Sequence, residues 1–287
     1  MPYVLTQILS QLPLALFAGS VGMALFEPTV RTNGLALLGL CFLVAPGISF
    51  ASLLVYRRIN VSFGEPVSSN RSSFRTVVFG FGLSTLTLSI LLLSLYFGGA
   101  VSFVWSKVNL LQLSVGAGLA CISAPIEEVI FRGVLQRKLT GRLGPAAGVS
   151  VSALLFSLAH LSNPGAGVQS FLIVATFTGI LLSATYWISR DLLACVAAHF
   201  TWNFLMFAIV GGNVSGFSSD GVVLMNADAG HLLSGGKFGI EASLLSPVAA
   251  ALSFLLLYNL SGKRSADSQT VNDSSSQQGS AATDSTS

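Results

Sequence analysis

Long stretches of this chain carry almost no charge. Only 9% of its 287 residues are Asp, Glu, Lys or Arg, and 52% are hydrophobic. Soluble domains have roughly a quarter of their residues charged, whereas a helix that crosses a bilayer needs about 20 mostly apolar residues. The composition therefore excludes an ordinary soluble fold and predicts an all-α, polytopic bundle of membrane-spanning helices.

Eight apolar segments are long enough to be considered as spans. They cover residues 8–26, 35–56, 76–105, 110–136, 146–162, 168–189, 192–211 and 240–260. We expect the third to tilt or to break at Gly98 and Gly99, and the Gly-, Ser- and Asn-rich segment 212–239 to form a flexible cap. Residues 1–260 then form one membrane domain. Residues 261–287 have too few apolar side chains to order and are expected to be a disordered cytoplasmic tail.

Lys and Arg residues between these segments predict the orientation, because basic residues accumulate on the cytoplasmic side. With a cytoplasmic N-terminus, ten of them lie inside and three outside. The inside set is Arg57, Arg58, Arg71, Arg75, Arg137, Lys138, Arg142, Arg190, Lys263 and Arg264, and the outside set is Arg31, Lys107 and Lys237. We therefore expect a multi-pass integral membrane protein with both termini in the cytoplasm.

The remaining composition excludes two classes of function. A net charge of +3 that is scattered along the chain does not make a nucleic-acid-binding face. Cys41, Cys121 and Cys195 lie in apolar runs and lack the paired spacing of a disulfide framework or a zinc ribbon. We expect these three cysteines to be packing residues.

Charged residues inside the fourth segment are the strongest indication of a functional site. Glu127, Glu128 and Arg132 lie within an otherwise apolar helix, where each charge costs roughly 2.5–3.5 kcal/mol unless it is paired or faces a polar cavity. Glu128 and Arg132 are four residues apart and can pair on one helix face, which leaves Glu127 turned about 100 degrees away. Pro125 removes a backbone donor and can kink the helix beside them. A structural alternative is that Arg132 extends to the interface near Arg137.

Two histidines also lie in apolar segments. His199 and Asn203 are four residues apart, so a helix presents their imidazole and carboxamide groups on one face. Phe156 lies four residues before His160 and can form a wall beside that imidazole. A lone histidine in a membrane helix is often structural, but two histidines together with the glutamates favour chemistry. His231 lies in the 212–239 segment and is assigned no role.

These side chains fit two kinds of hydrolytic site. A carboxylate and an imidazole on facing helices can remove a proton from a shared water, while imidazole and amide N–H groups can stabilise an oxyanion. Alternatively Glu127, Glu128, His160 and His199 can form a Zn²⁺ site with an open position for water. No His-Glu-x-x-His or Gly-x-Ser-x-Gly pattern is present near them. Cysteine catalysis by Cys195 lacks a third orienting group.

The ordered motifs Glu127-Glu128-x-x-x-Arg132, Phe156-x-x-x-His160 and His199-x-x-x-Asn203 resemble those of the CPBP intramembrane proteases. This family includes type II CAAX prenyl endopeptidases and bacterial relatives linked to bacteriocin processing or immunity. The resemblance covers residues 120–205, and beyond them it rests on the eight-span architecture.

The resemblance implies a role for each motif residue. Glu127 and His160 would activate the hydrolytic water, and His199 and Asn203 would bind the oxyanion. Glu128 and Arg132 would be the supporting pair. The resemblance leaves open whether zinc takes part, and Glu127 acting as a metal-independent base is the preferred reading. The implied substrate is a membrane-associated protein or peptide, lipid-modified in some members; the chain's own last four residues, Asp-Ser-Thr-Ser, are not a CAAX box.

The predicted boundaries place one catalytic residue at the wrong depth. At about 1.5 Å per residue, Glu127 and His199 lie roughly 15 and 12 Å from the cytoplasmic ends of their segments, and His160 about 20 Å from that side. The three side chains meet if the helix of His160 begins later than Ala146, or if it tilts strongly.

Two other classes of function remain open at this point. A catalytically silent membrane protein would use the polar cluster to hold a lipid-modified partner or to stabilise its own bundle. A proton-coupled transporter would use intramembrane Glu and His as a proton relay, although the chain has no recognisable repeat symmetry.

Overall fold

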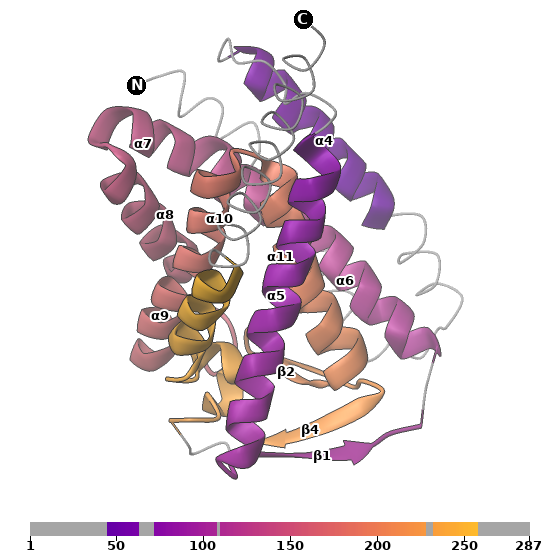
Figure 1. Cartoon of the computed structure of the whole chain (residues 1–287). Helices are drawn as coiled ribbons and strands as arrows, with labels where there is room; N and C mark the ends of the chain where they lie inside the picture. The colour runs from indigo at the N-terminus through magenta and orange to yellow at the C-terminus, as the bar shows by residue number, and fades with distance from the viewer. Residues whose placement is uncertain (1–44, 63–71, 108–109, 228–231, 258–287) are drawn as a thin grey trace, which may run out of the picture.

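The computed structural model describes residues 45–62, 72–107, 110–227 and 232–257. The predicted span 8–26, the beginning of the span 35–56 and the tail 261–287 lie outside these residues, as do Arg31, Cys41, Arg71 and His231. Within them the protein is a helical bundle with small strands at one end (Figure 1).

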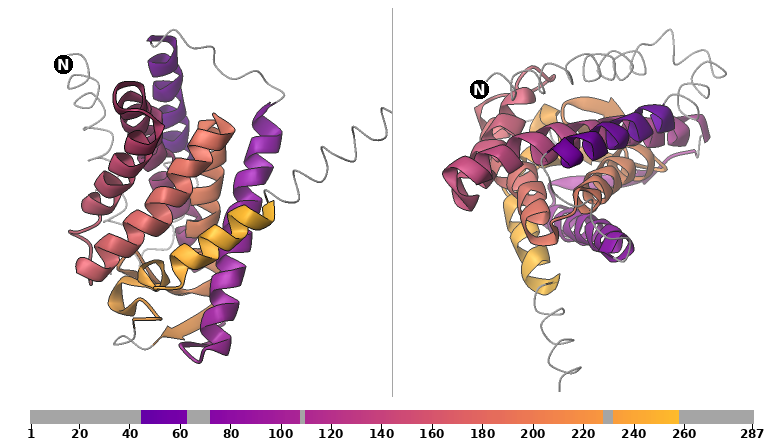
Figure 2. Two further views of the ribbon diagram at one scale, coloured as in Figure 1. Left: turned by 60° about the vertical axis from the view of Figure 1, so that its left-hand side comes forward. Right: turned by 90° about the horizontal axis from the view of Figure 1, so that it is seen from above.

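The helices form the body of the protein. α4 (Ala45–Ser62) and α5 (Ser72–Phe97) are followed by α6 (Leu110–Glu128), which continues through a π-helical segment, η2 (Val129–Gln136), into α7 (Arg137–Leu143). α8 (Pro145–Ala159) comes next, and α9 (Val168–Val174), η3 (Ala175–Gly179) and α10 (Ile180–Ser189) form one continuous helix. α11 (Leu192–Phe204) continues into η4 (Leu205–Val210) and packs against α5 and α6 at the centre of the bundle (Figure 2). A last helix covers Ser246–Leu257.

Four helices among the described residues are long and apolar enough to cross a membrane. They cover Phe74–Phe97, Leu110–Leu143, Val168–Ser189 and Leu192–Val210. The predicted segments 168–189 and 192–211 are therefore confirmed. The helix Pro145–Ala159 is shorter, and the described part of the last helix covers Ser246–Leu257. The start of the predicted span 240–260 is wrong, because Ile240–Ala242 form a 3₁₀ turn and the helix begins at Ser246. Its last residues lie outside the described part of the chain, and eight spans are not confirmed.

A small strand-containing cap covers one end of the bundle. β1 (Val101–Trp105) pairs with β4 (Val223–Ala227), and β2 (Gly212–Val214) pairs with β3 (Phe217–Ser219), both antiparallel. Two short 3₁₀ turns, η5 (Gly236–Phe238) and η6 (Ile240–Ala242), complete this cap. The strands correct the all-α prediction. The helix of the third segment ends at Phe97, so the predicted break at Gly98 and Gly99 is confirmed. The described part of 212–239 forms strands and turns rather than a flexible cap.

The helix around Pro125 is adapted to the missing backbone donor. Because proline has no N–H, the carbonyl of Cys121 one turn earlier loses its helical partner. The hydroxyl of Ser49 on α4 donates to that carbonyl. The wide π-helical turns begin four residues after Pro125. Such turns are frequent at functional sites, and here they follow directly after Glu127 and Glu128.

The depth difficulty disappears because the α6 helix is longer than predicted. The predicted end at residue 136 is wrong: Arg137–Leu143 continue the helix. Gly144, with φ +83°, then reverses the chain direction, and Pro145 begins α8. Glu127 lies sixteen residues before Leu143 and His160 fifteen residues after Pro145, or roughly 24 and 22 Å along the two helices. The two side chains therefore lie level with one another.

The end of the bundle opposite the cap carries most of the described basic residues. Thr76 Oγ1 on α5 donates to Asp191 Oδ2, the N-cap of α11, over 2.7 Å, so Arg75 and Arg190 share an end. Lys107 and Lys237 belong to the cap end. This separation agrees with the predicted grouping, and which end faces the cytoplasm stays a prediction.

Candidate active site

Glu128 and Arg132 form an ion pair in the interior of the bundle. Arg132 Nη1 lies 2.9 Å from Glu128 Oε1, and both side chains are fully buried. Arg132 Nη2 also donates to the carbonyl of Gly179 over 3.3 Å, and its guanidinium lies 4.4 Å from the ring centre of Phe156. The predicted four-residue pairing is confirmed, and the alternative in which Arg132 extends to the interface is wrong.

Glu128 also fixes the orientation of His199. His199 Nδ1 lies 2.8 Å from Glu128 Oε1, and a carboxylate can only accept. His199 therefore carries a proton on Nδ1, and its Nε2 faces the other side of the ring. The imidazole is 6% exposed. One carboxylate oxygen thus connects the guanidinium on η2 with the imidazole on α11.

His160 is oriented by the backbone of its own helix. It caps the C-terminus of α8, and its Nδ1 lies 2.8 Å from the carbonyl of Phe156. Because a carbonyl can only accept, this nitrogen also carries a proton. The other ring nitrogen, Nε2, faces Glu127. The Phe156 ring lies 4.6 Å from the His160 ring and 6.1 Å from the His199 ring. Phe156 therefore lies beside His160, as its spacing predicted, and its ring also contacts His199.

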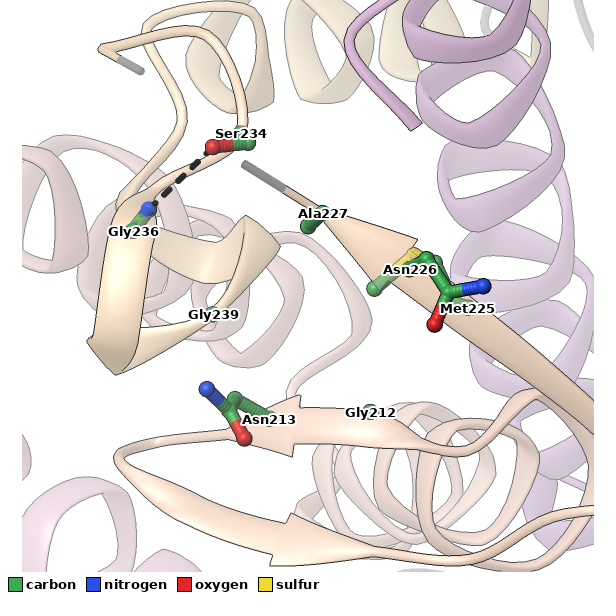
Figure 3. A pocket seen from close by; sticks show the side chains of 8 residues that line it. All are labelled: Gly212, Asn213, Met225, Asn226, Ala227, Ser234, Gly236 and Gly239. Carbon is green, nitrogen blue, oxygen red and sulfur yellow. Dashed lines mark hydrogen bonds between the residues drawn. The ribbon is translucent and has the colours of Figure 1, made fainter. Parts of the chain in front are cut away.

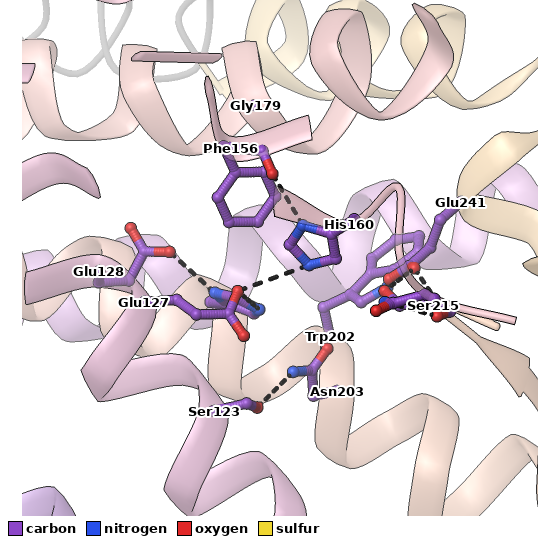
Figure 4. Close-up of polar contacts among 12 residues, drawn as sticks. Ser123, Glu127, Glu128, Phe156, His160, Gly179, Trp202, Asn203, Ser215 and Glu241 are labelled. Atoms are coloured by element: carbon purple, nitrogen blue, oxygen red, sulfur yellow. Dashed lines mark hydrogen bonds and ion pairs between the residues drawn. The ribbon is translucent and has the colours of Figure 1, made fainter. Parts of the chain in front are cut away.

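The free nitrogens of both histidines converge on Glu127. Glu127 Oε2 lies 3.7 Å from His160 Nε2 and 3.9 Å from His199 Nε2 (Figure 4). The Glu127 side chain is 26% exposed, although Oε2 itself is buried and accepts no hydrogen bond from the described part of the chain. Three groups from α6, the C-terminus of α8 and α11 thus face one small space.

Asn203 lies one helical turn from this centre. Its Nδ2 donates to Ser123 Oγ over 2.9 Å, and Ser123 in turn donates to the carbonyl of Leu119. Ser123 is four residues before Glu127, as Asn203 is four after His199, so the pair occupies the adjacent turn of both helices. One N–H of the carboxamide is held by Ser123, and the second remains for another acceptor.

The comparison with protein families agrees with these motifs. Residues 109–205 match the family described as type II CAAX prenyl endopeptidase Rce1-like. This segment is similar to that family. The predicted resemblance to CPBP intramembrane proteases is thereby confirmed, and the four long apolar helices together with this match make the chain an integral membrane protein. Searches of curated proteins and of solved structures found no match.

The predicted metal ligands do not all meet at one point. Among the described residues, no group of three or more His, Cys, Asp and Glu side chains has the arrangement of a metal site. Glu128 does not fit the predicted ligand set, because it lies on the Nδ1 side of the His199 ring, whereas Glu127 faces the Nε2 atom. Glu127, His160 and His199 remain as three donors of the predicted set.

The sequence pattern did not single out Glu241, which lies close to the same cluster (Figure 4). It is 3% exposed and belongs to η6 rather than to a spanning helix. Glu241 Oε1 accepts from Trp202 Nε1 over 2.6 Å. The signal that could have identified it is an acidic residue at the start of the predicted apolar segment 240–260, a weaker signal than Glu127, which lies within an apolar helix.

Two larger pockets lie elsewhere on the protein. One of about 230 Å³ is bounded by β2, β4 and Gly239 (Figure 3), and one of about 340 Å³ lies beside α9 and Lys237. None of the predicted site residues lines either of them. A cavity of about 10 Å³, the size of one water, lies beside His199 and Trp202. The site is therefore identified by its side-chain chemistry and not by cavity size.

Proposed function

We propose that this protein is an intramembrane endopeptidase. The observation that carries this proposal is the convergence of Glu127 Oε2 on the Nε2 atoms of His160 and His199, at 3.7 and 3.9 Å. These separations are too long for direct hydrogen bonds. A water that bridges the three groups would lie within hydrogen-bond distance of each. Ionisable side chains inside an apolar bundle lower its stability, so their presence favours a catalytic role.

Glu127 is the proposed general base. Its carboxylate and the Nε2 lone pair of His160 both accept from the bridging water, since His160 Nδ1 keeps its proton on the Phe156 carbonyl. The water oxygen attacks the carbonyl carbon of the peptide bond as its proton passes to Glu127. The same proton then moves to the leaving nitrogen, so that the amine departs neutral and Glu127 is again a carboxylate.

His199 and Asn203 are the proposed oxyanion donors. Nδ1 of His199 is held by Glu128, so its Nε2 donates when the ring carries both protons, and Glu127 and Glu128 lie on either side of the ring. With Arg132, the charges of this cluster then sum to zero. The second N–H of Asn203 supplies a further donor. Each donor of this kind contributes about 2.7–4 kcal/mol to transition-state stabilisation.

No step of this proposal passes through a metal. Glu128 is occupied by the Arg132 ion pair and by His199, which leaves the carboxylate of Glu127 to act as base rather than as one of two acidic ligands. Binding of Zn²⁺ by Glu127, His160 and His199 is a separate outcome that chelation of the purified enzyme detects.

The proposed substrate is a membrane-associated protein or peptide. The family description names CAAX prenyl endopeptidases, so a prenylated CAAX-type C-terminus is the first class to test. A substrate attached to the membrane approaches the site from the bilayer, and the bundle carries the site between spanning helices.

The test compares membrane proteomes of cells that produce the native chain or Glu127→Ala. The proposal expects protein fragments with new termini in the native sample that are missing with Glu127→Ala. Ser94→Ala, which removes an exposed hydroxyl on α5, is the matched control and should give the native fragments. Identical fragments from Glu127→Ala and the native chain would exclude Glu127 as the base. An unchanged proteome with reduced stability in Glu127→Ala would favour a binding protein instead.

A further inference from the structure

Glu241 is the acceptor for three donors from two different elements. Besides Trp202 Nε1, it accepts at Oε2 from the backbone N–H of Ser215 over 2.8 Å and from the Ser215 hydroxyl over 2.5 Å. A carboxylate can accept from all three donors because it carries no N–H group of its own, unlike the amide of Gln or Asn. Glu241 lies outside the segment 109–205 that matches the family.

One end of this arrangement reaches His160. The Ser215 carbonyl accepts from Asn163 Nδ2 over 2.8 Å, and the backbone N–H of Asn163 donates to the His160 carbonyl over 3.1 Å. Ser215 has φ +49°, a conformation that is uncommon for residues other than glycine. The contacts from Glu241 hold that conformation, which directs the Ser215 carbonyl toward the turn after α8.

The other end reaches His199 and Asn203. Trp202 lies between them in the sequence of α11, and its ring packs edge-on against Phe177 at 5.0 Å. It is 4% exposed, so its N–H depends on Glu241 for a partner. The single carboxylate therefore connects the helix of one catalytic histidine with the turn that carries the other (Figure 4).

We propose that Glu241 is a positioning residue that sets the separation between His160 and His199. This inference rests on the proposed peptidase function for its kinetic consequence, and its structural part stands without it. The connection between the end of α8 and α11 is a chain of hydrogen bonds. It runs from Asn163 through Ser215 and Glu241 to Trp202. Without it, the two Nε2 atoms are no longer held at matched distances from Glu127.

The kinetic test uses purified full-length protein and a fluorogenic peptide with a membrane anchor. Glu241→Gln keeps the volume of the side chain but places an N–H₂ group against donors, and it should lower kcat about 10- to 100-fold with KM within about threefold. Trp202→Phe keeps an aromatic ring but removes the indole N–H donor, and should have a smaller effect of the same kind. The matched control is Ser246→Ala, which breaks a buried bond to the Ile240 carbonyl in the same cap and should leave kcat within about twofold.

A second readout does not depend on turnover. Protein labelled in the histidine rings gives one set of imidazole signals per histidine, assigned with His160→Gln and His199→Gln. Glu241→Gln should shift the signals of both His160 and His199, and Asn163→Ala should shift that of His160 more than that of His199. Ser246→Ala should shift neither.

The two measurements separate the failure of each claim. Native imidazole signals and native kcat in Glu241→Gln would overturn the positioning role. Equal effects in Ser246→Ala and Glu241→Gln would overturn it as well, because they would indicate general loosening of the cap. Shifted signals in a protein that hydrolyses no peptide would leave the positioning role in place and refute the peptidase.

Discussion

Replacement of Arg132 by methionine tests whether the buried ion pair is part of the folded structure of the site. Arg132 is fully buried, and it contacts the Glu128 carboxylate at 2.9 Å, the Gly179 carbonyl at 3.3 Å and the Phe156 ring. Methionine fills most of the same space but leaves Glu128 as a buried carboxylate without its cation.

The expected loss follows from that uncompensated charge. Removal of one partner of a buried pair costs about 3–5 kcal/mol, which already includes the lost contact with Gly179. At about 2–4 °C per kcal/mol for a chain of this size class, the midpoint of thermal unfolding should fall by roughly 6–20 °C. The measurement is thermal unfolding in detergent, followed by circular dichroism. Arg142→Met, on an exposed residue of α7, is the control and should change stability by less than about 0.5 kcal/mol.

A double variant separates charge from packing. Glu128→Gln with Arg132→Met removes both charges and keeps an acceptor for His199 Nδ1, so stability should return to within about 1 kcal/mol of the native chain. Turnover should stay low, because glutamine does not favour the imidazolium of His199. A loss below about 1 kcal/mol in Arg132→Met, as for an exposed pair, would refute the reasoning. A double variant as unstable as the single one would refute it too.

Three further outcomes are expected. Gly148→Ala should lower stability by about 1–3 kcal/mol in the same unfolding assay, because its new Cβ would lie 2.6 Å from the Thr140 backbone nitrogen, whereas Gly141→Ala meets no atom within 4 Å and should be neutral or stabilising; equal losses in both would contradict the α7–α8 packing. Asn203→Ala should reduce kcat about 10²–10³-fold and Ser123→Ala less than about tenfold, and native turnover in Asn203→Ala would remove it from the oxyanion site. Treatment with 1,10-phenanthroline should leave peptide cleavage unchanged, and a loss that Zn²⁺ restores would contradict the metal-free proposal.

The motif residues were predictable because membrane helices make charged groups costly. Glu128 and Arg132 pair as their four-residue spacing predicts, and Phe156 lies beside His160 as expected. The convergence of Glu127, His160 and His199 was expected from their chemistry and from the resemblance. The helix periodicity alone did not place His160, because its depth depends on where the preceding helix ends.

The positions of the charged residues did not predict where that helix ends. The charges of Arg137 and Lys138 predict the start of a loop, but a helix can continue beyond the hydrocarbon, and Arg137–Leu143 do so before Gly144 reverses the chain. The strands of the cap were not predicted for a related reason. Strands of three to five residues such as Gly212–Val214 produce little periodic signal, and the pairing of β1 with β4 joins residues as far apart in the sequence as Val101 and Ala227.

Glu241 was overlooked because the apolar run that follows it made the whole segment resemble a span. In the structure the chain makes a 3₁₀ turn there, which directs the carboxylate toward Trp202 and Ser215. Burial of the Glu241 carboxylate is unfavourable without hydrogen-bond donors, and Trp202 and Ser215 supply them.

The central claim is that Glu127, held between two imidazoles, is the base for peptide-bond hydrolysis. The most direct test is the turnover of purified native protein and Glu127→Gln on one membrane-anchored peptide, with thermal unfolding of both samples as a check of folding. General-base catalysis contributes about 10²–10⁴-fold, so Glu127→Gln should lose at least about 100-fold in kcat with native stability. Cleavage at the native rate by a folded Glu127→Gln protein would contradict the account.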